Sequence, residues 1–397
     1  MIEPKQQRIL SIDAFRGITI LVMVFVNELA GTRDIPRWME HMKANEDAMS
    51  FVDVVFPAFL FIVGMSIPFA LANRTRKGDS FLQLQFHILW RTLGLLVLGV
   101  FMVNGEEGVN AAATGIPGSL WSLLFYISAI LVWNVYTFRN KRWGYILRGA
   151  GIAGLIVLGI IYRGGEDGGS RLQPHWWGIL GLIGWAYLYA CIFFQLLRGN
   201  IILLLLATAL CTAFYMIAHT PRLVEGNHLN WMSAQAGNAA HTSVVLCGII
   251  LSRIFFGDAP ATGIRNRFLQ ALLFAAILFI AGYFIRPYFK ISKIYATPTW
   301  CLYSAGICCV VFGFLYWLID IKKVSGWTGF FRPAGTNPLL TYIIPDILFA
   351  LFMLFHFTIL PNSLRYGLPG ILWAMIYAVA VMYIAKGLNA LKIRLQL

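Results

Sequence analysis

The sequence predicts an all-α, polytopic integral membrane protein, and three observations carry that prediction. Of its 397 residues, 59% are hydrophobic and only 12% are charged, whereas about 25% of residues are charged in an average soluble domain. Apolar runs of roughly 20 residues, the length that crosses a bilayer as a helix, recur along the chain. The polar segments between these runs are short. We therefore expect a single transmembrane domain over residues 1–397.

Each apolar run predicts one helix, and together they give about twelve membrane spans. The break between the sixth and the seventh, Arg198-Gly199-Asn200, is so short that ten or eleven spans remain an alternative. In chain order, the predicted helices cover residues 12–30, 51–73, 82–103, 119–138, 144–162, 176–197, 200–218, 239–256, 267–287, 299–320, 336–356 and 369–390.

The first of these runs predicts a retained helix. It follows a basic segment, as a signal peptide does, but it contains Asp13 and Arg16 and ends at Asn27 and Glu28 without a small-residue cleavage site. We expect this helix to form a hairpin with the next one, over residues 11–73, with the polar loop 31–50 between them.

The basic residues predict the orientation of these helices. With the N-terminus in the cytoplasm, the segments on that side hold about twice as many lysines and arginines as the outer loops, and basic residues resist translocation. Both termini are then expected in the cytoplasm. The net charge of +14 could suggest a nucleic-acid partner, but the basic residues are placed as in a membrane protein, so we expect contacts with membrane lipid and no nucleic-acid partner.

The cysteines predict neither a disulfide nor a metal centre. All six fall inside predicted helices, and their spacing fits no CxxC or Cys/His ligand pattern, so we interpret them as small core residues. They are Cys191, Cys211, Cys247, Cys301, Cys308 and Cys309.

A few polar side chains lie within or beside the predicted spans, where they cost free energy and are functional candidates. Asp13 and Arg16 stand three residues apart and also suit an ordinary ion pair. Asp53 also suits the start of a helix, where a carboxylate satisfies free amides. Arg91 lies inside the third span and needs an anionic partner, either a carboxylate or a ligand phosphate.

His41 is the only histidine in the loop 31–50. A histidine titrates near neutral pH, so it can act as a general base or as a transient nucleophile when a carboxylate or an amide orients its ring. Asn27 and Asp53 flank this loop at the ends of the two helices. We therefore predict that Asn27, His41 and Asp53 form a catalytic unit.

The same hairpin resembles the heparan-α-glucosaminide N-acetyltransferase family and its bacterial relatives, most strongly over about the first hundred residues. The motifs that carry the resemblance are Ser11-Ile-Asp-Ala-Phe-Arg-Gly-Ile-Thr-Ile, Met23-Val-Phe-Val-Asn27, His41, and Asp53-Val-Val-Phe-Pro57 with Phe61-Ile-Val-Gly64. Further motifs that agree are Trp90-Arg-Thr-Leu-Gly, Gly115-Ile-Pro-Gly118, Lys293 with Thr297-Pro-Thr-Trp300, and Gly335-Thr-Asn-Pro-Leu-Leu-Thr-Tyr342.

The resemblance implies transfer of an acetyl group from cytoplasmic acetyl-CoA to the amino group of a glucosamine on the other side of the membrane. It implies His41 as the catalytic histidine, with Asn27 and Asp53 beside it. We predict cofactor contacts at Asp13, Arg16, Arg91 and Asn337, and acceptor contacts at Glu28, Lys293 and Trp300.

The loop differs from the family pattern, because Glu28-Leu29-Ala30-Gly31 stands where the family has aromatic and glycine residues. The acceptor therefore stays open: an amino sugar or another glycan. We expect a bacterial inner-membrane location, with a homodimer as an alternative to a monomer. Two other functions also stay open, an O-acyltransferase for envelope glycans and an amino-sugar transporter, since many spans with buried charges also suit a carrier.

Overall fold

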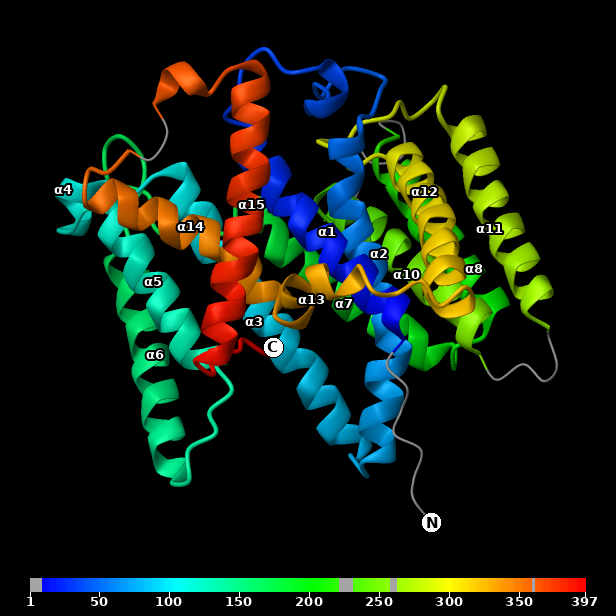
Figure 1. Cartoon of the computed structure of the whole chain (residues 1–397), viewed down its shortest axis with the longest axis horizontal. Coiled ribbons are helices and arrows are strands. Elements are labelled where there is room, and N and C mark those ends of the chain that lie inside the picture. The colour runs from blue at the N-terminus through cyan, green and yellow to red at the C-terminus, as the bar shows by residue number, and fades with distance from the viewer. Residues whose placement is uncertain (1–8, 221–230, 258–262, 359–360) are drawn as a thin grey trace. The chain divides into compact units, whose positions relative to one another are not determined.

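A computed structural model describes residues 9–220, 231–257, 263–358 and 361–397, and within these ranges the secondary structure is helical with no β-strand (Figure 1). The principal helices are α1 (Leu10–Leu29), α2 (Phe51–Arg76), α3 (Phe81–Glu107), α5 (Gly118–Trp133), α6 (Lys141–Ile161), α7 (Gly178–Leu196), α8 (Ile201–Ala218), α10 (Trp231–Phe256), α11 (Ile264–Ile285), α12 (Pro298–Tyr316), α14 (Pro338–Leu354) and α15 (Gly367–Ala390). Short helices are η1 (Arg37–Met39), α4 (Ala111–Thr114), η2 (Trp317–Ile321), α13 (Thr328–Thr336) and η3 (Asn362–Leu364).

Each predicted helix corresponds to one of the principal helices, so the all-α class is confirmed. In the described part of the chain, ten helices are long and apolar enough to cross a membrane. An eleventh is added if α13 and α14, which meet at a bend of 78°, are counted as one broken span. The protein is therefore a multi-pass membrane protein by helix length and composition, while the full count of twelve and the cytoplasmic termini stay predictions.

Several helix boundaries differ from the sequence prediction by a few residues, and those of α10 and α5 differ most. Helix α10 begins at Trp231, eight residues before the predicted start, because polar residues in its first turns have partners within the helix: Asn238 is buried and its side chain donates to Gln235. Helix α5 ends at Trp133, because the next residue, Asn134, accepts a hydrogen bond from the Arg394 amide near the C-terminus.

The chain divides into two compact units, and the boundaries between them fall inside α1, α3, α7 and α13 and just before η1. Unit 1 comprises Met1–Thr19, Pro36–Leu89 and Trp185–Arg332, and unit 2 comprises Ile20–Ile35, Trp90–Gly184 and Pro333–Leu397. The prediction of a single transmembrane domain, with the hairpin 11–73, stays a prediction.

Unit 1 is built around α10, which packs against α2, α8 and α12, while α11 packs beside α12 (Figure 1). Glycine allows α2 and α10 to approach each other closely. A side chain at Gly64 would collide with the Val245 carbonyl, and one at Gly248 would collide with the Phe61 carbonyl. This close packing fixes the frame from which the first turn of α2 projects.

Unit 2 contains the pairs α5 with α6, α5 with α14, and α14 with α15. Asn337 stands at the start of α14 and is buried. Its side chain donates to Asn389 (3.0 Å) and to the Ile393 carbonyl (3.1 Å), and it accepts from the Leu395 amide (3.3 Å). Asn337 therefore holds the C-terminal segment against the start of α14.

Candidate functional site

The first candidate site lies in unit 1, where the loop that follows η1 meets the start of α2. His41 lies in this loop, and Ser50 is the residue that caps α2. Asp53 is the third residue of the helix, so its side chain reaches back over the first turn toward the loop. The local geometry of a helix start thus brings the Asp53 carboxylate under His41.

The Asp53 carboxylate is only 1% exposed, and donors from the loop surround it. One oxygen, Oδ2, accepts the Ser50 amide (3.0 Å), the Ser50 hydroxyl (3.3 Å) and the Met42 amide (3.3 Å). The other, Oδ1, lies 2.7 Å from Nδ1 of His41. A buried carboxylate with this many donors is held in its anionic form.

This contact determines which nitrogen of His41 is available for chemistry. Because an ionised carboxylate only accepts hydrogen bonds, Nδ1 must carry the proton that it donates to Asp53. The lone pair of the neutral ring then lies on Nε2. The His41 side chain is 37% exposed, so the ring is reachable from outside, and Nε2 is the nitrogen that can act as a base or a nucleophile.

Lys293 brings a positive charge to the same ring. Its Nζ lies 3.2 Å from Nδ1 and 3.2 Å from Nε2 of His41, from the segment that joins α11 to α12. Burial lowers the pKa of Lys293, and the nearby Asp53 carboxylate opposes this only in part, so the net pKa is below the ordinary lysine value. An ammonium group at this position can stabilise negative charge that develops on a reacting oxygen atom close to His41.

Hydrogen bonds tie the His41 loop to the segment that carries Lys293. Asp47 accepts from Arg286 (3.1 Å) and from the Ile291 amide (2.8 Å), and the Ser292 hydroxyl donates to the Ala44 carbonyl (2.9 Å). Burial alone would raise the pKa of Asp47, but these two donors outweigh it, and the net pKa is lowered. Both segments are therefore held in one arrangement.

Trp300 contacts the backbone of Asp53. Its indole Nε1 donates to the Asp53 carbonyl at 3.0 Å, and the side chain is fully buried. The predicted contact of Trp300 with an acceptor stays a prediction, whereas its contact with Asp53 is direct.

Asp13 and Arg16 form the ion pair that their spacing suggested, at 3.1 Å, and Arg16 also donates to the Ser66 hydroxyl at 2.8 Å. Their predicted contact with a cofactor stays a prediction. Arg91 lies half-buried in the part of α3 that belongs to unit 2. The donors and acceptor of the Asn337 side chain are engaged by the C-terminal segment, so its predicted cofactor contact would require these bonds to open.

A second candidate site, here called the unit 2 cavity, has a volume of about 510 Å³. Glu28 lies in its wall, where it accepts the Trp373 indole N–H (2.8 Å) and lies 3.7 Å from the Arg365 guanidinium. The polar and aromatic side chains in the lining are Asn27, Glu28, Glu106, Tyr342, Asp346, Phe349, Phe352, Phe357, Thr358, Arg365, Trp373 and Tyr377.

The cavity lining includes a carboxylate that the sequence analysis missed. Glu106 stands at the end of α3, next to Glu107 and beyond the predicted end of that helix, where acidic residues are typical of a solvated helix end. The sequence offered one signal: Glu106 follows Met102 by four residues, so the two side chains lie on the same face of the helix. Both line this cavity. Asn27 belongs to this lining and to unit 2, so its predicted place beside His41 stays a prediction.

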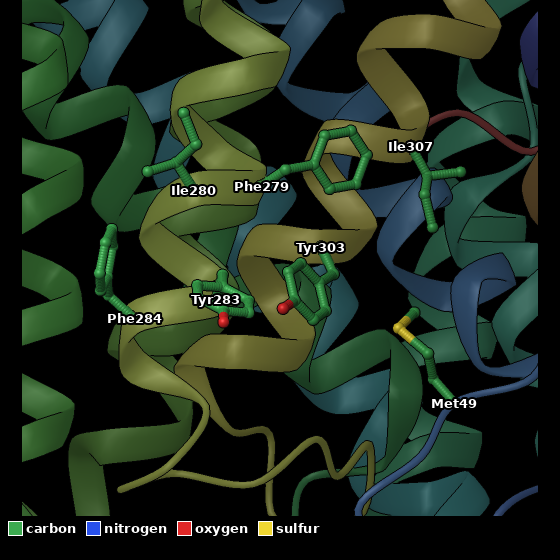
Figure 2. A pocket seen from close by; sticks show the side chains of 7 residues that line it. All are labelled: Met49, Phe279, Ile280, Tyr283, Phe284, Tyr303 and Ile307. Atoms are coloured by element: carbon green, nitrogen blue, oxygen red, sulfur yellow. The ribbon is translucent and has the colours of Figure 1, made fainter.

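Unit 1 also contains an apolar groove of about 690 Å³ between α11, α12 and the residue Met49. Figure 2 shows its seven lining side chains: Met49, Phe279, Ile280, Tyr283, Phe284, Tyr303 and Ile307. None of these side chains is charged. The groove therefore offers no charged side chain to a ligand, unlike the region around His41.

Two comparisons with known proteins show what this chain is similar to. Residues 8–239, more than half of the chain, match the family model described as a domain of unknown function, DUF5009. The heparan-alpha-glucosaminide N-acetyltransferase of Homo sapiens is 32% identical over 129 residues, and that of Mus musculus is 31% identical over 129 residues. Each match covers 31% of this chain and 19% of the relative.

The matched segment thus spans about a fifth of the length of these two relatives. The predicted resemblance to that acetyltransferase family is confirmed by both matches. The match over residues 8–239 includes the whole hairpin with His41 and Asp53. On this evidence, the chain belongs to the DUF5009 family and is a relative of the heparan-α-glucosaminide N-acetyltransferases.

Proposed function

We propose that this protein is a transmembrane acetyltransferase that transfers an acetyl group from cytoplasmic acetyl-CoA to the amino group of a glucosamine-type sugar on the outer side of a bacterial inner membrane. The names of the two relatives support the acetyl transfer. The single observation that carries the proposal is the contact of His41 Nδ1 with the buried Asp53 carboxylate. This pair leaves Nε2 as an accessible base.

The proposed reaction exchanges a thioester for an amide. The sugar amine attacks the thioester carbonyl carbon, a C–N bond forms, the C–S bond breaks, and CoA leaves as its thiolate. His41 Nε2 accepts the proton that the nitrogen loses and returns it to the CoA sulfur. Asp53 stabilises the imidazolium that exists between these two transfers. In this direct mechanism no acyl group is left on the histidine.

Lys293 is assigned an electrostatic role in the same reaction. The thioester carbonyl becomes an oxyanion when the amine attacks, and a fixed positive charge within a few ångströms stabilises it. Lys293 Nζ lies 3.2 Å from Nε2 of His41, which is the atom that faces the reacting amine in this proposal. The hydrogen bonds between the two segments hold that charge in place.

The proposed topology explains why an acetyl donor and an acceptor from opposite sides can react. With about twelve spans and both termini in the cytoplasm, the loop 31–50 faces outward. A bilayer core is about 30 Å thick, and an acetyl-CoA pantetheine arm that enters from the cytoplasm reaches well into it. Arg16 and Arg91 are the basic side chains proposed to hold the polar parts of acetyl-CoA.

The chemistry of the unit 2 cavity suits an ammonium-bearing sugar. Carboxylates such as Glu106 and Asp346 favour a cation and accept hydrogen bonds from hydroxyl groups. Aromatic faces such as Trp373 and Tyr377 suit the apolar face of a sugar ring and also attract a cation. These groups support an amino sugar as the acceptor in preference to a neutral glycan hydroxyl.

The proposal is tested by release of free CoA from acetyl-CoA by purified protein in detergent, with and without glucosamine or a glucosamine-ended oligosaccharide. His41→Ala is expected to lower turnover by about 10²–10⁴-fold, the usual contribution of a general base. A matched pair of variants separates catalysis from folding: His41→Asn, and His175→Asn as the control. His175 is an exposed loop histidine with a positive φ of 45°, a conformation that asparagine adopts readily.

Undiminished turnover of the His41 variants, with normal size-exclusion profiles, would contradict the proposal. The transporter alternative makes a different prediction, because it requires uptake of labelled N-acetylglucosamine into proteoliposomes that lack acetyl-CoA. An O-acyltransferase would acetylate a glycan hydroxyl and leave the sugar amine unmodified, which mass spectrometry of the product distinguishes.

A further inference from the structure

The inference concerns Trp300 and a proline in the first turns of α2. In an α-helix, the carbonyl of each residue accepts the amide N–H four residues further on. For Asp53 that residue is Pro57, which lies inside α2 and has no amide hydrogen. The Asp53 carbonyl is therefore left without its partner within the helix, in a buried position where a missing hydrogen bond costs free energy.

Trp300 supplies the missing donor. Its indole Nε1 lies 3.0 Å from the Asp53 carbonyl oxygen, and the bond is buried. Trp300 stands in the first turn of α12, immediately after the segment that carries Lys293. A donor from another helix thus takes the place of the backbone amide that Pro57 lacks.

The indole of Trp300 is fixed from a second direction by packing. It is fully buried and meets the His241 ring of α10 edge to face at 6.2 Å, and the same histidine meets Phe56 of α2 at 5.3 Å. Helices α2, α10 and α12 therefore converge on the turn that contains Asp53. Because Trp300 cannot shift without disturbing this packing, it gives the Asp53 backbone a rigid support.

We propose that Trp300 is a positioning residue, whose indole N–H replaces the amide that Pro57 lacks and so holds Asp53 in the orientation that aims its carboxylate at His41. The catalytic consequence rests on the proposed acetyl transfer, while the structural coupling of Trp300 to His41 does not. The indole N–H of Trp300 has the Asp53 carbonyl as its acceptor because Pro57 leaves that carbonyl free.

The test is a double-mutant experiment with a matched control. Trp300→Phe keeps most of the aromatic packing but removes the donor, and it is expected to lower kcat about tenfold with little change in KM, because one hydrogen bond to a buried carbonyl is lost. Pro57→Ala restores an amide N–H that the Asp53 carbonyl accepts within the helix. Adding Pro57→Ala to Trp300→Phe is therefore expected to recover most of the lost kcat.

Pro68→Ala is the control, because it removes the other proline of α2 without giving Asp53 a donor. Adding Pro68→Ala to Trp300→Phe is expected to recover none of the lost kcat. The inference is overturned if Trp300→Phe matches the wild type, if Pro57→Ala fails to recover kcat, or if Pro68→Ala recovers it equally. If Trp300→Phe does not fold, the same comparison is read from the yield of folded protein, and recovery by Pro57→Ala alone supports the inference.

A second readout separates this inference from the proposed function. Diethyl pyrocarbonate acylates accessible imidazole nitrogens, and mass spectrometry gives the rate at His41 without any need for turnover. Trp300→Phe is expected to slow this reaction several-fold, because Nε2 is less nucleophilic when Asp53 no longer holds the ring, and Pro57→Ala is expected to restore the rate. Absence of acetyl transfer in the wild type would overturn the function, and an unchanged rate at His41 would overturn the positioning role.

Discussion

The Asp53 carboxylate in unit 1 and the carboxylates of the unit 2 cavity both cost free energy in a membrane protein, but they differ in burial and in hydrogen-bond partners. Asp53 is 1% exposed, and both its oxygens contact donors of the same unit. Glu106 is exposed and Asp346 is half-buried, and both face a cavity of about 510 Å³. The Asp53 carboxylate already has hydrogen-bond partners within the protein, whereas the Glu106 and Asp346 carboxylates face a space that a ligand can enter.

This difference indicates two kinds of function. A charge whose partners are all internal has a fixed geometry, which is what general base catalysis requires of the group that orients a histidine. Carboxylates that line a cavity complete their contacts with whatever enters it, which is what recognition of a ligand requires. We therefore expect substitutions around Asp53 to change turnover, and substitutions in the unit 2 cavity to change substrate affinity.

The largest effect is expected from Asp53→Asn. The amide keeps the shape of the carboxylate, but its Nδ2 donates hydrogen bonds and cannot accept them. It must face either the His41 Nδ1–H or the Ser50 donors, so two donors then face each other without an acceptor. The wrong ring tautomer of His41 is then favoured, and kcat is expected to fall by about 10²–10⁴-fold. Steady-state CoA release at saturating acceptor measures this.

Glu46→Gln is the control for Asp53→Asn. Glu46 is a carboxylate of the same loop, paired at 3.0 Å with the exposed guanidinium of Arg37, and such exposed pairs contribute little. The kcat of Glu46→Gln is expected to stay within about twofold of the wild-type value. Equal losses in the two variants would show that the loop is merely sensitive to charge and that Asp53 has no special role.

Lys293→Met is expected to have the next largest effect, a loss of about 10- to 100-fold in kcat, because it removes the positive charge beside His41 Nε2 and keeps the side-chain length. Lys290→Met, on the same segment, is the control. The pKa of Lys293 is lowered from its ordinary 10.5. If the ammonium is required, wild-type turnover must fall as pH rises through that lowered pKa, whereas Lys293→Arg, which stays charged, extends activity to higher pH.

Glu106→Gln tests the other side of the comparison. Loss of one charge from the unit 2 cavity is expected to raise KM for the amino sugar about tenfold, since a hydrogen bond to a charged group is lost, with kcat nearly unchanged. Glu107→Gln is the matched control, because Glu107 is adjacent in α3 and exposed but is not part of the cavity lining. A change in kcat alone would assign Glu106 to chemistry and remove the contrast with Asp53.

The helices could be predicted from the sequence because lipid requires long apolar runs, and each run became a helix. Asp53 and His41 could be selected because polar groups beside such runs are costly and because the hairpin motifs resemble a known family. Their contact depends on a loop that Asp47 ties to Arg286, 239 residues further along the chain, and no local pattern encodes that pairing.

Two other residues show why the remaining features needed the structure. Trp300 could be noted from a motif, but its contact with Asp53 follows from a proline that leaves a carbonyl without a partner. Glu106 resembled a solvated helix end because hydropathy describes a single residue and its neighbours in sequence. Only the arrangement of α3 with the other elements of unit 2 reveals the cavity that this carboxylate faces.

The smallest effect is expected from Asp47→Asn, which weakens the tie between the His41 loop and the Lys293 segment. Asp47 has a lowered pKa in the folded protein, so the folded state binds fewer protons than the unfolded state just below pH 3.8. Its contribution to stability is therefore complete above pH 3.8 and is lost as pH falls through the lowered value. Because Asp47 is about one third exposed, the contribution is below about 1 kcal/mol.

Asp79→Asn separates the two consequences of this change, because the Arg74–Asp79 pair (2.7 Å) lies elsewhere in unit 1, between α2 and α3. Both variants are expected to lower the melting temperature slightly at pH 7. Only Asp47→Asn is expected to lower kcat, by about two- to threefold, since Asp47, unlike Asp79, helps to set the distance between Lys293 and His41. Its stability difference from the wild type should shrink as the pH falls below 3.8, and a difference that is independent of pH would show that the charge of Asp47 does not hold this loop.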